Sequence, residues 1–362
     1  MRIFPCCLIA LLTLVPYAGA KTKTASTPPP IPVKVVAVAM FEAGADTGDI
    51  PGELQNWVER DHLDTIYPLP SAYHDVRMNS DGELAIVTGQ GTAYAAATIM
   101  ALGLDPRFDL THAYWIVAGI AGANPEYASL GSAVWANWIV DGDLGYEIDA
   151  REIPQNATAW STGMVPLRKT KPFEEPAAAL PGQFYQTNRS LMLWAYGLTK
   201  NVALADSAHL AEVRSHFDGA AANNPPQVLL GDEVSSSTYW HGKLMDAWAT
   251  RWMSYFTGGQ GKFVTTAMED TGTLQSLRLL ANAKRVDWQR VLILRTVSNY
   301  DQQPRGMDAA TSLAAQRTSK FGAYLPSIES AYTVGHTVVT ELLKNWPQYQ
   351  EQIPKQEPQQ QP

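Results

Sequence analysis

Residues 86–97 read Ile-Val-Thr-Gly-Gln-Gly-Thr-Ala-Tyr-Ala-Ala-Ala, and residues 113–123 read Ala-Tyr-Trp-Ile-Val-Ala-Gly-Ile-Ala-Gly-Ala. We expect each of these segments to begin as a buried strand and to end in a glycine-rich turn. Glycine at a strand end lets the backbone approach a ligand and point its N–H groups at it. The pattern is typical of a nucleotide or nucleoside site.

Apolar strands and helical segments alternate on both sides of this stretch. The expected strands are 33–40, 84–88, 114–118, 133–140, 227–231, 263–266 and 291–297. The expected helices are 53–59, 92–102, 186–201, 207–216, 239–255, 270–282, 309–319 and 331–345. This alternation predicts an α/β fold with three α/β/α layers, in which helices cover both faces of a central mixed sheet. Ligands bind beyond the carboxyl ends of the strands in such sheets.

The two ends of the chain differ in composition from the region between them. Residues 1–20 have the features of an export signal, with Arg2, a short apolar run and a small-residue cleavage site ending at Ala20. We expect a Pro-rich linker over 21–32, the α/β domain over 33–346 and a disordered Gln/Pro tail over 347–362. The expected location is therefore the periplasm or the outside of the cell.

Composition excludes several classes of partner. A formal net charge of −8 argues against nucleic acid as a ligand. No segment after residue 20 has the ~20 consecutive apolar residues that a membrane-spanning helix needs. Both cysteines, Cys6 and Cys7, lie inside the signal, and the histidines do not stand at metal-ligand spacing. We expect no metal and no other cofactor.

Short motifs at the strand ends resemble those of the purine nucleoside phosphorylase and methylthioadenosine nucleosidase superfamily, in the same order. They are Ala39-Met40-Phe41-Glu42, Thr88-Gly89-Gln90-Gly91, Gly119-Ile120-Ala121-Gly122, the strand leading to Asp141, Leu230-Gly231-Asp232, Ala267-Met268-Glu269 and Arg295-Thr296-Val297-Ser298-Asn299. Within that superfamily the chain is similar to the exported proteins called purine nucleoside permeases. The resemblance implies a phosphorylase/hydrolase-like fold, a purine nucleoside as ligand and a possible homodimer.

The resemblance also assigns roles to residues. It implies that the backbone turns at Thr88, Gly89, Gly119, Ala121 and Gly122 border the ligand. Met268 packs on the sugar, and the Glu269 carboxylate accepts hydrogen bonds from the ribose hydroxyls. The alternative is that Glu269 only complements the dipole at the start of a helix.

The base side of the site has two candidates by resemblance. Asn299, after Ser298, aligns with the group that contacts the purine, whereas Asp301 matches an Asp-Gln-Gln that follows the active residue in nucleosidases. An asparagine binds a 6-oxopurine through its amide, and an aspartic acid can donate a proton. Asp232 would anchor the loop on this side. Ordinary turns after strands are the alternative for these polar residues.

Cleavage of an N-glycosidic bond passes through an oxocarbenium-like sugar, which a nearby carboxylate stabilises. Glu42 is the candidate for orienting or activating water, with a solvated loop residue as the alternative. Phosphate as a co-substrate is possible, since Arg77, Arg151 and Arg295 are available. Ile120 replaces the serine that often contacts phosphate, however, and no arginine lies between residue 21 and Arg60.

These features predict an exported protein that recognises a purine nucleoside and cleaves its N-glycosidic bond, by hydrolysis rather than phosphorolysis. The alternative is a component of nucleoside transport that binds the nucleoside without cleaving it.

Overall fold

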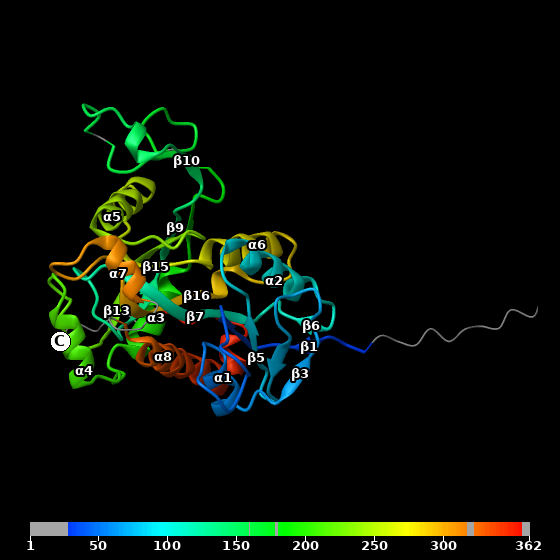
Figure 1. Ribbon diagram of the computed structural model, residues 1–362. Helices are drawn as coiled ribbons and strands as arrows, with labels where there is room; N and C mark the ends of the chain where they lie inside the picture. The colour runs from blue at the N-terminus through cyan, green and yellow to red at the C-terminus, as the bar shows by residue number, and fades with distance from the viewer. Residues whose placement is uncertain (1–27, 159, 178–179, 317–321, 357–362) are drawn as a thin grey trace, which may run out of the picture.

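The computed structural model describes residues 28–356, except 159, 178–179 and 317–321. This part of the chain forms a mixed β-sheet between two layers of helices, as predicted (Figure 1). The expected export signal and most of the linker lie outside the described residues. The linker's last two residues form β1 (Ile31–Pro32), which pairs in parallel with β6 (Phe108–Asp109).

The sheet branches at its longest strands. Its main path runs β12 (Phe184–Gln186), β9 (Trp138–Asp141), β14 (Asp232–Ser235), β15 (Phe263–Ala267), β7 (Tyr114–Ala123), β2 (Val35–Ala39), β5 (Glu83–Val87), β4 (Val76–Met78) and β3 (Thr65–Tyr67). The branch contains β16 (Val291–Tyr300), β8 (Ala133–Ala136) and β13 (Val228–Leu230). β16 pairs with β7 along one edge, while β2 and then β15 share the other. The carboxyl ends of β2, β15 and β16 therefore meet the second half of β7.

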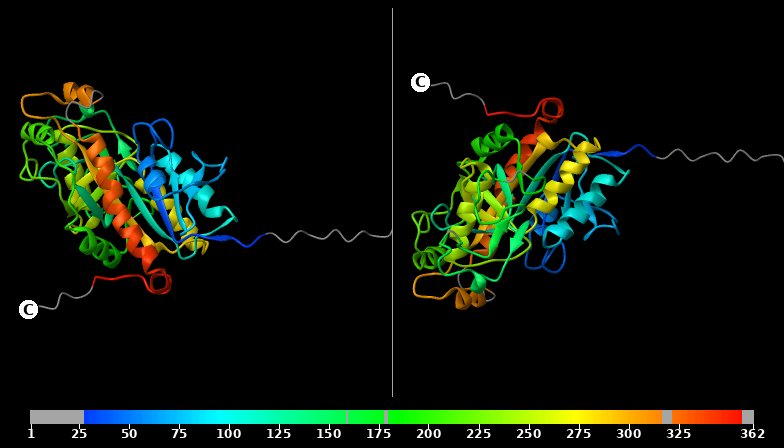
Figure 2. Two further views of the ribbon diagram at one scale, coloured as in Figure 1. Left: turned by 90° about the horizontal axis from the view of Figure 1, so that it is seen from below. Right: turned by 90° about the horizontal axis from the view of Figure 1, so that it is seen from above.

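Helices cover both faces of this sheet, as Figure 2 shows from below and from above. α2 (Thr92–Leu104) and α6 (Asp270–Asn282) pack on one face. α1 (Gln55–Arg60), α3 (Arg189–Thr199) and α8 (Tyr324–Lys344) pack on the other. Successive side chains of a strand point to opposite faces, so β2 is apolar throughout and contributes to both hydrophobic clusters.

Six more helices and one strand pair complete the described part of the chain. They are α4 (Ala208–Ser215), α5 (Lys243–Thr257), α7 (Ala309–Gln316), α9 (Trp346–Tyr349), the short helices η1 (Ala150–Glu152) and η2 (Trp288–Arg290), and the antiparallel pair β10 (Gly145–Glu147) and β11 (Met164–Pro166). The segment that carries β10 and β11 stands out from the body beside α5 (Figure 1).

Two sequence predictions around β7 and β8 are wrong in detail. The second glycine segment is not a turn, because β7 continues through Gly119 and Gly122 to Ala123. A side chain at Gly119 would overlap Met40 Cε and the Glu53 carboxylate, so this glycine permits close approach rather than a turn. The single strand expected over 133–140 is two strands, interrupted at Asn137.

The expected disordered tail does not begin at residue 347. Residues 346–349 form α9, and the Tyr349 carbonyl accepts hydrogen bonds from Tyr114 Oη (2.7 Å) and Arg290 Nη1 (2.7 Å). These bonds attach the segment to the body of the domain. Residues 357–362 lie outside the described part of the chain.

Candidate functional site

A cavity with an internal volume of about 120 Å³ lies where the carboxyl ends of β2, β15 and β16 meet β7. Seven of the predicted site residues line it: Ala121, Gly122, Met268, Glu269, Ser298, Asn299 and Asp301. The cavity has a glutamate end, defined by Glu53 and Glu269, and an Asn299 end, defined by Ser298, Asn299 and Asp301.

Glu269 connects the cavity to the first glycine turn. It follows β15 and stands immediately before α6. Its Oε1 accepts from the Gly91 N–H (3.3 Å), and its Oε2 accepts from the Met268 N–H (3.2 Å). Burial raises the pKa of Glu269, since only 5% of the residue is exposed. Glu269 therefore lies at a helix start and also lines the cavity, so both sequence interpretations fit its position.

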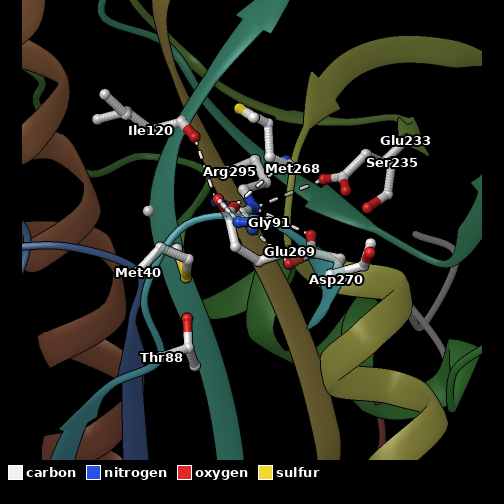
Figure 3. Close-up of polar contacts among 12 residues, drawn as sticks. Met40, Thr88, Gly91, Ile120, Glu233, Ser235, Met268, Glu269, Asp270 and Arg295 are labelled. Atoms are coloured by element: carbon white, nitrogen blue, oxygen red, sulfur yellow. Dashed lines mark hydrogen bonds and ion pairs between the residues drawn. The ribbon is translucent and has the colours of Figure 1, made fainter. Parts of the chain in front are cut away.

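Arg295 supplies the positive charge beside Glu269 at the glutamate end (Figure 3). Asp270 accepts hydrogen bonds from its Nε (2.9 Å) and Nη2, and Glu269 lies 3.3 Å from Nη2. Glu233 lies 3.6 Å from Nε, and the Ile120 carbonyl accepts from Nη1 (3.2 Å). Four of the five nitrogen-bound hydrogens of the guanidinium thus donate to protein oxygen atoms.

The cluster holds more carboxyl groups than cations. Glu233 is fully buried, and neither of its oxygens accepts a hydrogen bond from the described residues. Burial and the neighbouring Asp270 raise the pKa of Glu233 well above its ordinary value. Burial alone would lower the pKa of Arg295, but Asp270 and Glu233 raise it. The sequence singled out Arg295 only as a phosphate candidate and missed this cluster.

Glu53, rather than Glu42, is the loop carboxyl that lines the cavity. Its Oε2 accepts from the Met40 N–H (2.6 Å) and its Oε1 from the Ile120 N–H (2.7 Å). Burial raises the pKa of Glu53 to about 8, against the lowering effect of Arg295. The sequence showed Glu53 only as one acid in an acidic loop, and no spacing signal distinguished it.

Glu42 has a structural role that removes it from the candidate site. Its carboxylate accepts from the backbone N–H groups of Ala43 (2.8 Å) and Gly52, and from those of Leu54 (2.9 Å) and Gln55 (2.7 Å). These bonds close the loop and satisfy N–H groups at the start of α1. The prediction that Glu42 acts on water is therefore corrected, since its oxygens are committed to the backbone outside the cavity.

At the Asn299 end, Ser298 and Asn299 lie within β16 instead of a turn. The Asn299 amide donates to Tyr239 Oη (3.0 Å) and to the Tyr300 carbonyl (3.2 Å), and its carbonyl accepts from Ser298 Oγ (2.8 Å). Both amide hydrogens are thus engaged by the protein. Asp301 directly follows the strand and is 1% exposed, and neither of its carboxyl oxygens accepts a hydrogen bond from the described residues.

Four other predicted residues do not line the cavity: Thr88, Gly89, Gly119 and Asp232. Thr88 is buried, and its Oγ1 donates to the Gly89 carbonyl (3.0 Å). Gly89 has φ +83° in the first glycine turn, whose Gly91 N–H holds Glu269. The predicted glycine turn is therefore present. Its Gln90 lines the cavity, and its Gly91 N–H binds the Glu269 carboxylate.

Asp232 stabilises the interruption between β8 and β9. Its Oδ1 accepts from the N–H groups of Asn137 (3.2 Å) and Trp138 (2.7 Å), and its Oδ2 accepts from Lys262 N–H (2.7 Å). Buried N–H groups need such partners where a strand breaks. The predicted role of Asp232 at the ligand is corrected to a structural one.

The aromatic residues of the cavity come from two loops. Tyr239 and Trp240 line it, together with Phe41. Trp135 instead donates from Nε1 to Thr199 Oγ1 (3.0 Å), and Trp138 packs against Phe184. Among the described aromatic residues, Phe41, Tyr239 and Trp240 are therefore the ones placed to contact a ligand in the cavity.

Comparison with known proteins agrees with this architecture. The family model described as "Purine nucleoside permease (NUP)" matches residues 32–354. The chain belongs to the purine nucleoside permease family. A Schizosaccharomyces pombe relative named "Probable purine nucleoside permease" is 30% identical over 354 residues, covering 94% of this chain and 96% of the relative. A Candida albicans purine nucleoside permease is 28% identical over 287 residues, covering 79% and 70% respectively.

Solved structures share the fold at low sequence identity. The 5′-methylthioadenosine/S-adenosylhomocysteine nucleosidase of Neisseria meningitidis is 15% identical, with a TM-score of 0.50 over 86% of this chain and all of that one. A Helicobacter pylori nucleosidase of the same name is 14% identical, with a TM-score of 0.50 over 85% and 99%. The predicted fold class is thereby confirmed for this permease-family chain.

None of the helices in the described ranges is long and apolar enough to cross a bilayer.

Proposed function

We propose that this chain binds a purine nucleoside in the cavity and hydrolyses its N-glycosidic bond. The observation that carries the proposal is the pair of buried carboxyls, Glu53 and Glu269, that line the cavity at its glutamate end. Hydrolysis of a glycosidic bond uses a carboxylate to stabilise an oxocarbenium-like sugar and a second to activate water. Glu269 fits the first role through the ribose hydroxyls, and Glu53 fits the second.

The charges around the cavity support water rather than phosphate as the nucleophile. No Lys, Arg or His is among the described residues that line the cavity. Arg295, the nearest candidate, already binds carboxylates and a carbonyl. Arg77 pairs with Asp46, and Arg151 pairs with Asp149 at the surface. A phosphate dianion would therefore meet buried carboxyls without a free cation to offset its charge.

The decisive measurement is the set of products formed from inosine, guanosine and adenosine, with and without phosphate. We expect free base and free ribose without phosphate, and no ribose 1-phosphate when phosphate is added. Product identity by chromatography and mass spectrometry separates the possibilities. Ribose 1-phosphate as the main product would replace hydrolysis by phosphorolysis, and nucleoside binding without any free base would favour the transport-binding alternative that the relatives' names suggest.

Replacing Glu269 tests the ribose contact. We expect Glu269→Ala to weaken nucleoside binding by roughly 10- to 100-fold, because hydrogen bonds to a charged group contribute roughly 1.5–3 kcal/mol. Arg295 keeps Asp270 and Glu233 as partners in this variant. Calorimetry measures the Kd, with the exposed Glu152→Ala as the matched control. An unchanged Kd for Glu269→Ala would remove Glu269 from the binding site.

Export and self-association complete the proposal. Residues 1–20 support cleavage after Ala20, and the intact mass of the mature protein reads the cleavage point. The homodimer rests on the resemblance alone, and the molecular mass in solution tests it.

A further inference from the structure

Asp270 occupies the face of Arg295 that carries two parallel N–H donors (Figure 3). Its Oδ2 accepts from Arg295 Nε (2.9 Å), and its Oδ1 accepts from Nη2. The residue is the first of α6 and is fully buried. A guanidinium binds phosphate through the same pair of parallel bonds, so the aspartate takes the place that an oxyanion would need.

The guanidinium of Arg295 lies directly behind the wall of the cavity. It is buried and does not line the cavity itself, but two of its other partners do. Its Nη1 donates to the Ile120 carbonyl (3.2 Å), and its Nη2 donates to Glu269 (3.3 Å). One hydrogen, on Nη1, remains outside the bonds that the described residues accept, which is one fewer than a paired phosphate contact needs.

Glu233 is a second carboxyl that can pair with the same cation. It is fully buried in β14, and its Oε2 lies 3.6 Å from Arg295 Nε. Burial and the neighbouring Asp270 raise the pKa of Glu233 well above its ordinary value. Loss of the Asp270 charge would remove part of that effect, so Glu233 could ionise and take over as the partner of Arg295.

We propose that Asp270, with Glu233 behind it, keeps Arg295 from binding oxyanions and thereby selects water over phosphate as the nucleophile. The choice of nucleophile rests on the proposed hydrolysis, whereas the exclusion of phosphate does not require turnover. Both carboxyls are positioning residues, because they act through Arg295 and neither lines the cavity.

A simpler interpretation is that Asp270 only complements the dipole at the start of α6. That role requires neither full burial nor a paired contact with a guanidinium, and Asp270 has both. The two interpretations also differ in what they predict. An aspartate that acts on the helix alone has no effect on phosphate binding, whereas one that occupies Arg295 controls it.

The test is the double variant Asp270→Asn/Glu233→Gln, titrated with inorganic phosphate at constant ionic strength. Phosphate that binds the folded state raises the melting temperature, which gives an apparent Kd. We expect this Kd to be roughly 10- to 100-fold lower than in wild type, the usual effect of charge-assisted hydrogen bonds. Asp206→Asn is the matched control, because it removes the same paired contact from Arg214 (2.7 and 2.9 Å), and neither residue lines the cavity. An equal gain in the control would overturn the proposal.

Two further measurements separate charge from structure. Asp270→Glu keeps the carboxylate and should remain as insensitive to phosphate as wild type, whereas a purely structural role would make it resemble the asparagine variant. Asp270→Asn alone keeps Glu233 beside Arg295, so it should fold more readily than the double variant and show a smaller gain in the same direction.

The proposal is overturned if wild type itself binds millimolar phosphate, or if neither asparagine variant gains phosphate affinity. Absence of nucleoside cleavage by wild type would instead overturn the hydrolysis alone, because phosphate binding is measured without turnover.

Discussion

Glu53→Gln is expected to lower kcat by roughly 10²- to 10⁴-fold, which is the usual contribution of a general base. Glutamine cannot take a proton from water. It fills the same space, but its amide nitrogen cannot accept the bond that one of the Met40 and Ile120 N–H groups donates, so a lower melting temperature is expected as well. Nucleoside binding, measured by calorimetry, should stay within a few-fold of wild type, because the ribose contact belongs to Glu269. Single-turnover release of free base gives the chemical rate directly.

The pH dependence gives this prediction a second readout. A base acts in its deprotonated form, and the pKa of Glu53 is raised to about 8. The wild-type kcat/KM should therefore rise about tenfold per pH unit below pH 8 and level off above it. The rising limb should disappear in Glu53→Gln. A glutamine variant that keeps both the rate and the limb would show that another group activates water.

Glu42→Gln is the matched control, because Glu42 also binds backbone N–H groups but lies outside the cavity. It should lower the melting temperature, since an amide nitrogen cannot accept those bonds, and leave kcat within about tenfold of wild type. The reverse result, with Glu42→Gln inactive and Glu53→Gln active, would restore the assignment made from sequence.

The contrast between these two glutamates shows what the sequence can and cannot predict. Strands and helices were predictable because their apolar periodicity is local, and Met268-Glu269 was found because the residues are adjacent in the chain. Glu53 enters the cavity only because Glu42 folds the intervening loop back onto Met40. That contact joins residues 13 apart through side-chain bonds to the backbone, for which no sequence period exists.

Gly119 shows the same limit of sequence-based prediction. The sequence identified this glycine as important near the site, but attributed it to a turn. In the structure the strand continues, and the missing side chain makes room for Met40 and Glu53. A glycine in an apolar run signals close approach as well as a turn, and only the packing partner decides which applies.

Arg295→Met should be the most destabilising of the substitutions considered. Arg295 is 1% exposed, and its guanidinium binds Asp270 and lies beside Glu233 and Glu269. Removing one partner of a buried ion pair costs about 3–5 kcal/mol, because the remaining charge has neither water nor a counter-ion. Here more than one carboxyl loses its cation. We expect a melting temperature several degrees below wild type, or little folded protein.

Arg151→Met is the matched control, since it makes the same exchange at a surface pair. Arg151 is 89% exposed in its side chain and binds Asp149, so its loss should leave the melting temperature almost unchanged. A third variant, Arg295→Lys, separates charge from shape, because lysine keeps the charge but cannot bind Asp270 through two nitrogens. It should fall between the other two. If Arg295→Met melts within one degree of Arg151→Met, the surrounding carboxyls must take up protons when the arginine is lost, and the ion pairs would not be a main source of stability.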